Sequence, residues 1–99
     1  MQDAFSFEWD QDKAESNLRK HGILFEVGAK VFLDIARTTI VDNRRDYGEV
    51  RLNAFGYIDN RLYSVVFVED VSRNVVRIIS ARKANARERK CYGHREIHH

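Results

Sequence analysis

Two arginines lie where the sequence is otherwise apolar: Arg77 inside the run VVRII, and Arg51 between a valine and a leucine. A buried guanidinium without a partner is costly, so each arginine needs an ion pair, an exposed edge position or a ligand. One interpretation is an ion pair of Arg77 with Glu49 or Glu69. The other is a phosphate clamp, because the planar five-donor fork of arginine fits phosphate oxygens. Two such arginines on one sheet face would form a phosphate site, but sequence alone does not fix the strand register that decides this.

Arg82 and Lys83 add two cations at the predicted junction between a strand and a helix. Free backbone N–H groups at the start of a helix would favour an anion beside them. Simple solvation of two cations at a helix start is the alternative.

Two residues are candidates for proton transfer. His21 belongs to the side-chain class that changes charge near neutral pH, so it could act as a general acid or base. Its alternative role is to cap the C-terminus of a helix. Glu49 is the best-placed carboxylate for a base, and an ion pair with Arg51 or Arg77 is compatible with that role.

Basic charge is concentrated in the last quarter of the sequence. Residues 73–99 carry eight Lys and Arg against two Asp and Glu, although the net charge of the chain is only +2. Such clustering is typical of proteins that bind a phosphate backbone, and a solvated cationic helix is the alternative. Tyr92 could stack on a base or anchor its helix to the sheet. The candidate nucleic-acid-binding residues are Arg87, Arg89, Lys90 and Tyr92.

The spacing of Cys91, His94, His98 and His99 superficially resembles zinc ligation. We discount a zinc site because these residues lie in a tail that we expect to be frayed, with no second cluster of ligands. The sequence contains no P-loop, GxGxxG, HExxH or nucleophile-elbow motif. We therefore expect neither a metal nor a cofactor.

The composition is that of a soluble globular protein, with 43% hydrophobic and 32% charged residues among 99. The acidic N-terminal segment does not resemble a signal peptide, and no apolar run is long enough to span a membrane. Cys91 is the only cysteine, so an internal disulfide is excluded. We expect a cytoplasmic protein that does not interact with membranes.

The pattern of apolar residues predicts an α+β domain: a short N-terminal strand, two helices, three or four antiparallel strands and a closing helix. Asp10 is a plausible N-cap and Gly22 a plausible C-cap of the first helix, and Asp59-Asn60 suits a hairpin turn. The expected strands are 5–9, 37–42, 50–58, 62–69 and 75–81, and the expected helices are 11–21, 25–33 and 84–92.

Several blocks of the sequence resemble the BrnT toxin family, formerly DUF497. They are FEWD at 7–10, KHGI at 20–23, VFLD at 31–34, GEVR at 48–51 and RIISARKA at 77–84. The resemblance extends to about Tyr92, so we expect residues 1–92 to form a single toxin domain and 93–99 a frayed tail. Ile35 departs from the pattern at a position where proline is usual in the family.

The resemblance implies a fold like that of RelE-type ribonucleases, with two N-terminal helices packed against an antiparallel sheet. It also implies a toxin that cuts RNA and thereby inhibits translation. Its partner would be BrnA, a ribbon-helix-helix antitoxin, and the complex of the two would bind operator DNA.

A metal-independent mechanism agrees with both lines of reasoning. A base takes the proton of a ribose 2′-OH, which attacks the adjacent phosphorus and expels the 5′-oxygen. We assign Arg77, Arg82 and Arg51 to stabilising the charge that grows on the phosphoryl oxygens, with Lys83 as a supporting cation. Glu49 or His21 is the candidate for proton transfer. The competing hypotheses are a non-catalytic RNA- or DNA-binding module and a purely structural adaptor.

Overall fold

A mixed β-sheet forms the centre of the computed structural model, which describes residues 6–44, 46 and 48–93. Within these residues, five strands follow the order β1–β5–β4–β3–β2 across the sheet. The strands are β1 (Ser6–Glu8), β2 (Thr38–Asp42), β3 (Arg51–Ile58), β4 (Arg61–Asp70) and β5 (Val75–Lys83).

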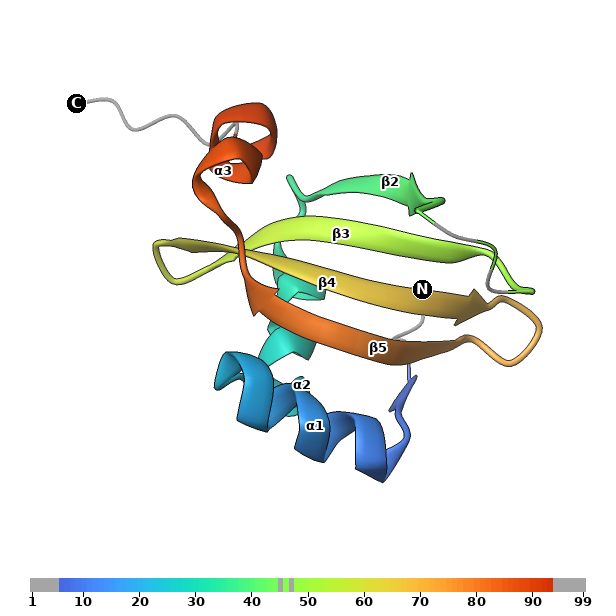
Figure 1. The fold of residues 1–99 in the computed structure, drawn as a ribbon. Coiled ribbons are helices and arrows are strands. Elements are labelled where there is room, and N and C mark those ends of the chain that lie inside the picture. Colours follow the sequence, from blue (N-terminus) through green and yellow to red (C-terminus); the bar gives the residue numbers. More distant parts are fainter. Residues whose placement is uncertain (1–5, 45, 47, 94–99) are drawn as a thin grey trace.

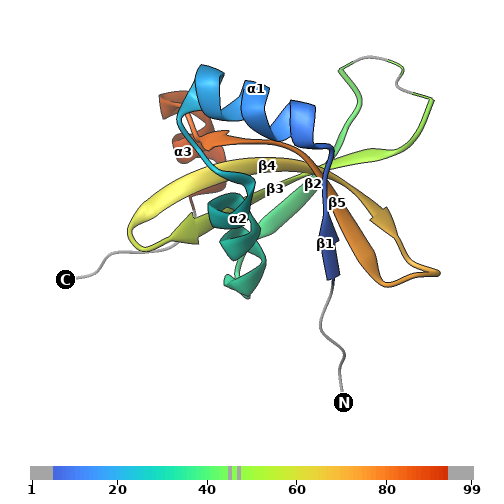
Figure 2. The same cartoon turned by 90° about the horizontal axis from the view of Figure 1, so that it is seen from below.

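Helices cover both faces of this sheet (Figure 1). On one face lie α1 (Gln11–His21) and α2 (Phe25–Gly28), and α2 continues into the 3₁₀-helix η1 (Ala29–Leu33). The opposite face carries α3 (Ala86–Tyr92), and the view from below in Figure 2 shows α1 and α2 in front of the strands. No helix within the described part of the chain is long and apolar enough to cross a membrane.

This arrangement confirms the predicted α+β class and the predicted order of elements. The antiparallel part of the sheet consists of β2 to β5, and β1 adds a strand parallel to β5, with Ser6 opposite Val75 and Glu8 opposite Arg77. Phe5, at the start of the predicted first strand, lies outside the described residues. So does the predicted frayed tail beyond Gly93.

Two predicted boundaries are wrong by a few residues. The last strand continues to Lys83, and α3 begins only at Ala86, because the backbone N–H of Ala84 still donates to the carbonyl of Leu62 in the sheet (3.0 Å). The predicted helix 25–33 also changes type after Gly28. The change from α-helix to 3₁₀-helix lies between Gly28, which contacts β5, and Val31, which contacts β3.

Both contacts depend on glycine. A Cβ on Gly28 would lie 2.7 Å from the Cβ of Ala81 in β5, and a Cβ on Gly56 in β3 would lie 2.8 Å from Cγ1 of Val31 in η1. Real Cβ atoms do not approach this closely, so α2 and η1 can rest directly on the sheet only because neither glycine has a side chain.

The main core lies between the sheet and the helices α1, α2 and η1. Its fully buried side chains include Phe25, Val31, Val65 and Ile78, and Trp9 packs edge-on against Phe25 with ring centroids 5.8 Å apart. Burying side chains of this size stabilises the fold by about 1.5–3 kcal/mol each. This core therefore fixes β5, the strand that carries Arg77, Arg82 and Lys83.

Asn17 of α1 completes the outer edge of β5, which β1 pairs only over Val75–Arg77. Its Nδ2 group donates to the carbonyls of Ala81 (2.8 Å) and Ile23 (2.9 Å), and its Oδ1 accepts from the N–H of Ala81 (3.0 Å). The side chain thus replaces a neighbouring strand at one residue. It also satisfies backbone groups that would be costly to bury without partners.

Candidate functional site

The face of the sheet opposite α1 and α2, which we call the open face, carries most of the polar side chains that were expected to do chemistry. Side chains of directly paired residues point to the same side of a sheet. The pairs Asp42–Arg51 and Val68–Arg77, together with the register of Leu52 on Phe67, bring Arg51 and Arg77 to this face on either side of β4. The register therefore answers the question that the sequence left open.

Glu49 connects these two arginines. Its Oε1 accepts from Nη2 of Arg77 at 2.7 Å, and its Oε2 accepts from Nε of Arg51 at 3.3 Å. All three side chains are partly exposed, so solvent and a ligand can reach them. Of the two predicted carboxylate partners of Arg77, the structure selects Glu49, and one carboxylate facing two guanidinium groups leaves a net positive charge. We call these three residues the Glu49 cluster.

Arg82 lies at the other end of the open face, beneath α3. Arg82 and Lys83 are the last two residues of β5, so the junction with the helix lies two residues later than predicted, at Ala84 and Asn85. Nη1 and Nη2 of Arg82 each donate to one carboxylate oxygen of Glu88 at 2.8 Å. These hydrogen bonds hold the pKa of Glu88 below its ordinary range and raise that of Arg82.

The start of α3 is also closed by its own side chains. Oδ1 of Asn85 accepts from the N–H of Glu88 (2.8 Å), and Oε1 of Glu88 accepts from the N–H of Asn85 (2.9 Å), which together form a capping box. The expected anion site at free helix N–H groups therefore has two of its groups already paired. Glu88 joins this cap to the guanidinium of Arg82.

Two of the predicted catalytic residues lie away from the open face. Lys83 follows Arg82 in the strand and so points to the other side, opposite Tyr63, which packs against the main core. His21 ends α1 on the same far side and is exposed, in the last turn of the helix, where a cation suits the helix dipole.

The predicted RNA-binding residues of α3 have different surroundings. Arg87, Arg89 and Lys90 are exposed, and Nη1 of Arg89 also donates to the carbonyl of Ala84 (3.1 Å). The ring of Tyr92 stacks on Phe55 of β3, with centroids 4.2 Å apart and an interplanar angle of 11°. Tyr92 thus anchors α3 to the open face, as the structural interpretation of this residue proposed.

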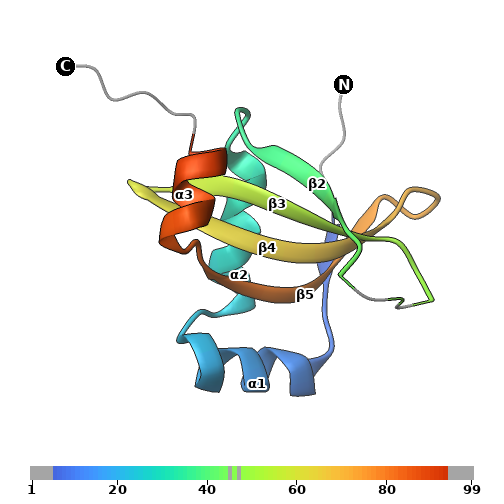
Figure 3. The same ribbon diagram turned by 45° about the horizontal axis from the view of Figure 1, so that its top comes forward.

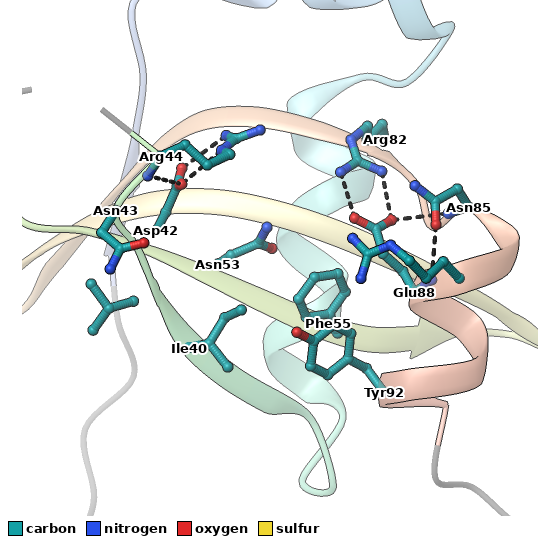
Figure 4. Close-up of a pocket in the computed structure, with 12 residues that line it drawn as sticks. Ile40, Asp42, Asn43, Arg44, Asn53, Phe55, Arg82, Asn85, Glu88 and Tyr92 are labelled. Atoms are coloured by element: carbon teal, nitrogen blue, oxygen red, sulfur yellow. Dashed lines mark hydrogen bonds and ion pairs between the residues drawn. The ribbon is translucent and has the colours of Figure 1, made fainter. Parts of the chain in front are cut away.

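Figure 3 shows α3 lying over the strands on the open face. A cleft of about 370 Å³ lies between α3 and the end of β2 (Figure 4). One side holds the Arg82–Glu88 pair and the other the pair of Arg44 with Asp42, in which Nε and Nη2 of Arg44 donate to the carboxylate at 2.7 and 2.9 Å. Arg44 lowers the pKa of Asp42 through these hydrogen bonds. Asn53 lies between the two pairs (Figure 4). We call this feature the Asn53 cleft.

Sequence reasoning missed Asp42, Arg44 and Asn53 as site residues. The alternation in residues 50–58 already placed Arg51, Asn53 and Phe55 on one side of a strand. An asparagine on the same side of the strand as Arg51 could have indicated Asn53 as a site residue. Arg44 gave no comparable signal, because it lies in a polar turn where an arginine is ordinary.

The described residues contain no group of three or more His, Cys, Asp or Glu that could hold a metal ion. Three of the residues with zinc-like spacing, His94, His98 and His99, lie outside the described part of the chain. What the open face offers is a set of guanidinium groups from Arg44, Arg51, Arg77, Arg82 and Arg87, among three carboxylates. Such a surface suits a polyanion.

Comparison with known families adds a description of the relatives. A family model described as "Ribonuclease toxin, BrnT, of type II toxin-antitoxin system" matches residues 9–88, which include both the Glu49 cluster and the Arg82–Glu88 pair. No curated protein matches the chain.

Proposed function

Because the chain belongs to the BrnT family of ribonuclease toxins from type II toxin–antitoxin systems, its target class is RNA and its partner is an antitoxin; we propose that it cleaves RNA on the open face, without a metal, by attack of a ribose 2′-OH. The observation that carries this proposal is the Glu49 cluster, in which one carboxylate lies within hydrogen-bonding distance of two guanidinium groups.

A phosphate of the RNA backbone would compete with Glu49 for Arg51 and Arg77, since the same guanidinium forks fit both anions. Once displaced, the carboxylate would lie beside the bound phosphate, where it can take the proton of the adjacent 2′-OH. The 2′-oxygen then attacks phosphorus, and the bond to the 5′-oxygen breaks as that oxygen takes a proton from solvent. The products are a 2′,3′-cyclic phosphate and a free 5′-OH.

Arg51 and Arg77 would stabilise the negative charge that grows on the phosphoryl oxygens during this step. Arg82 lies in the row of Phe55, about 13 Å further along the strands at 3.3 Å per residue. We therefore assign Arg82 to a neighbouring part of the RNA backbone, and Arg87 and Lys90 to outer phosphates. His21 and Lys83 lie on the other side of the sheet, so Glu49 is the stronger candidate for the base.

The test is RNA cleavage in excess EDTA, with analysis of the product ends. We expect cleavage to persist, with cyclic or 3′-phosphate ends and free 5′-OH ends. Glu49→Gln should lower the rate by about 10²- to 10⁴-fold, the usual contribution of a general base. Glu69→Gln is the matched control because it removes an exposed carboxylate from the same sheet.

Arg77→Lys should also lose much activity, because lysine keeps the charge but not the planar fork. Products with 5′-phosphate ends would reject the 2′-OH route. Equal rates for the two Glu→Gln variants would reject Glu49 as the base. RNA that is bound but never cut would support the alternative, a non-catalytic nucleic-acid-binding module.

In the cell, we propose that the uninhibited protein depletes messenger RNA in the cytoplasm and so inhibits translation. Its antitoxin would be a ribbon-helix-helix protein whose acidic or amphipathic segment folds onto the open face, and the complex would bind operator DNA. Expression without the partner should arrest growth, and protein synthesis continuing at its normal rate would contradict the toxin role.

A further inference from the structure

The Asn53 cleft has the polar and apolar surfaces that a nucleobase needs. Ile40, Phe55 and Tyr92 line one part of it, and polar side chains, among them Asn53 and the two arginine–carboxylate pairs, line the rest (Figure 4). Its volume of about 370 Å³ lies within the range of small-ligand sites, about 300–1,000 Å³. A free phosphate has no apolar surface to bury against Ile40, Phe55 and Tyr92, whereas a base presents apolar ring faces together with polar edges.

Both carboxylates in the cleft are already engaged as acceptors. Asp42 accepts from Nε, Nη2 and the backbone N–H of Arg44. Glu88 accepts from both terminal nitrogens of Arg82 and from the backbone N–H of Asn85. The side chains of Asp42 and Glu88 are only 3% and 8% exposed. A ligand therefore finds little acceptor capacity there.

Asn53 supplies the opposite polarity. Its residue is 8% exposed, and its Oδ1 accepts a hydrogen bond from Oγ of Ser64 at 2.9 Å. Ser64 is 1% exposed and belongs to the neighbouring strand, and its hydroxyl holds the oxygen of the amide toward β4. Within the described residues, the Nδ2 group has no hydrogen-bond acceptor, and the side chain borders the cleft. The cleft floor is thus a hydrogen-bond donor.

An asparagine with both amide groups available typically reads adenine, which offers a donor at N6 and an acceptor at N7. Here the amide oxygen already accepts from Ser64 and both carboxylates are engaged, whereas Nδ2 and the arginines donate, so the cleft offers mainly donors and few acceptors for the N6 group of adenine. Guanine presents two acceptors, O6 and N7, on the same edge. We infer that the Asn53 cleft binds a base of the RNA substrate through its acceptor atoms and selects guanine over adenine. This inference rests on the proposed cleavage of RNA.

The first measurement is sequencing of the 5′-OH ends produced from a random RNA pool. We expect one position near the cut to favour guanine over adenine by at least about fivefold, the lower end of what one good base contact provides. Asn53→Asp replaces the donor by an acceptor of the same shape, so the preference should invert. Asn60→Asp, an identical change in the exposed β3–β4 turn, should leave it as it is.

Ser64→Ala tests the same inference without altering the cleft lining. Freed from the serine hydroxyl, the Asn53 amide can turn either way, so the ratio of guanine to adenine should move toward one. This variant carries the test if Asn53→Asp does not fold, which circular dichroism would reveal. A wild-type preference that neither folded variant changes would overturn the inference, and so would cleavage with no difference between the two purines.

A binding experiment separates this inference from the proposed reaction. The wild-type protein is titrated with GMP and with AMP while the side-chain amide signals of Asn53 are followed by NMR. Because both nucleotides carry the same phosphate, a larger shift with GMP isolates the contribution of the base. Selective binding without any RNA cleavage would refute the proposed reaction and support the cleft. RNA cleavage together with equal shifts of the Asn53 signals for GMP and AMP would refute the inferred guanine selectivity but not the proposed reaction.

Discussion

Replacing Asn17 by alanine should destabilise the protein far more than an ordinary substitution in a surface helix. The amide makes three hydrogen bonds to backbone groups of Ala81 and Ile23, at 2.8–3.0 Å, and the residue is 5% exposed. Each such bond contributes about 1 kcal/mol, with a further penalty where a buried backbone group loses its partner. After about 0.6 kcal/mol regained from helix propensity, we expect a loss of about 3 kcal/mol in unfolding free energy.

The assay is urea unfolding followed by circular dichroism, with Ser16→Ala in the same helix as the control for propensity. A loss of that size corresponds to a decrease of about 12–24 °C in Tm. Asn17→Asp should be at least as damaging at neutral pH, since one oxygen of its carboxylate would face two carbonyl oxygens. If Asn17→Ala lay within about 0.5 kcal/mol of Ser16→Ala, the strand-edge role that we assign to this amide would be refuted.

Three further outcomes are expected. Arg82 lowers the pKa of the Glu88 carboxyl in the folded state. The ionised Glu88 therefore stabilises the folded protein fully above the unfolded-state pKa of about 4.3, and this contribution is lost as the pH falls through the lower folded-state pKa. The difference in unfolding free energy between wild type and Glu88→Gln, measured in urea, should therefore be constant from pH 6 to 8 and shrink below about pH 4; a difference that grew in acid would contradict this sign. Tyr92→Phe should keep the stacking on Phe55 and change the unfolding free energy by less than about 0.5 kcal/mol, whereas Tyr92→Ala should lower it by about 2 kcal/mol. Equal Tm values for the two variants would show that the ring does not anchor α3. Stopped-flow association with the antitoxin should slow as salt rises, and Arg87→Glu with Lys90→Glu should slow it further at low salt; rates independent of both would place the antitoxin elsewhere.

Local patterns predicted most of the elements because their causes are local. Asp10 accepts from the N–H groups of Asp12 and Lys13, and Gly22 adopts a left-handed conformation with φ of 72°, so both ends of α1 follow from single residues. Asp59 likewise has φ of 57° in the β3–β4 turn. The parallel pairing of β1 with β5 has no local cause. It joins residues 69 positions apart, as in Ser6 opposite Val75, and no nearby residue specifies it.

The candidate site also combines features that the local sequence predicts with features that depend on how the strands and α3 come together. That Arg51 and Arg77 needed partners followed from their apolar neighbours, and Glu49 was among the candidates. Which face they share depends on register, which is a property of three strands together. The pairing of Arg82 with Glu88 was not predicted, because it depends on where α3 begins. A shift of two residues in the start of that helix separates a free helix terminus from a closed capping box.

The position of β5 inside the sheet also determines when, during synthesis on the ribosome, the open face can assemble. β5 lies between β1 and β4, and it carries Arg77 and Arg82, so neither half of the site exists before residues 75–83 have been made. At about 5–20 residues per second, β1 waits about 4–15 seconds for β5 to be completed, and β4 waits about 0.7–3 seconds. A growing chain therefore has no assembled open face with which to attack the message that encodes it, and the activity that we propose would begin only after translation of this segment is complete.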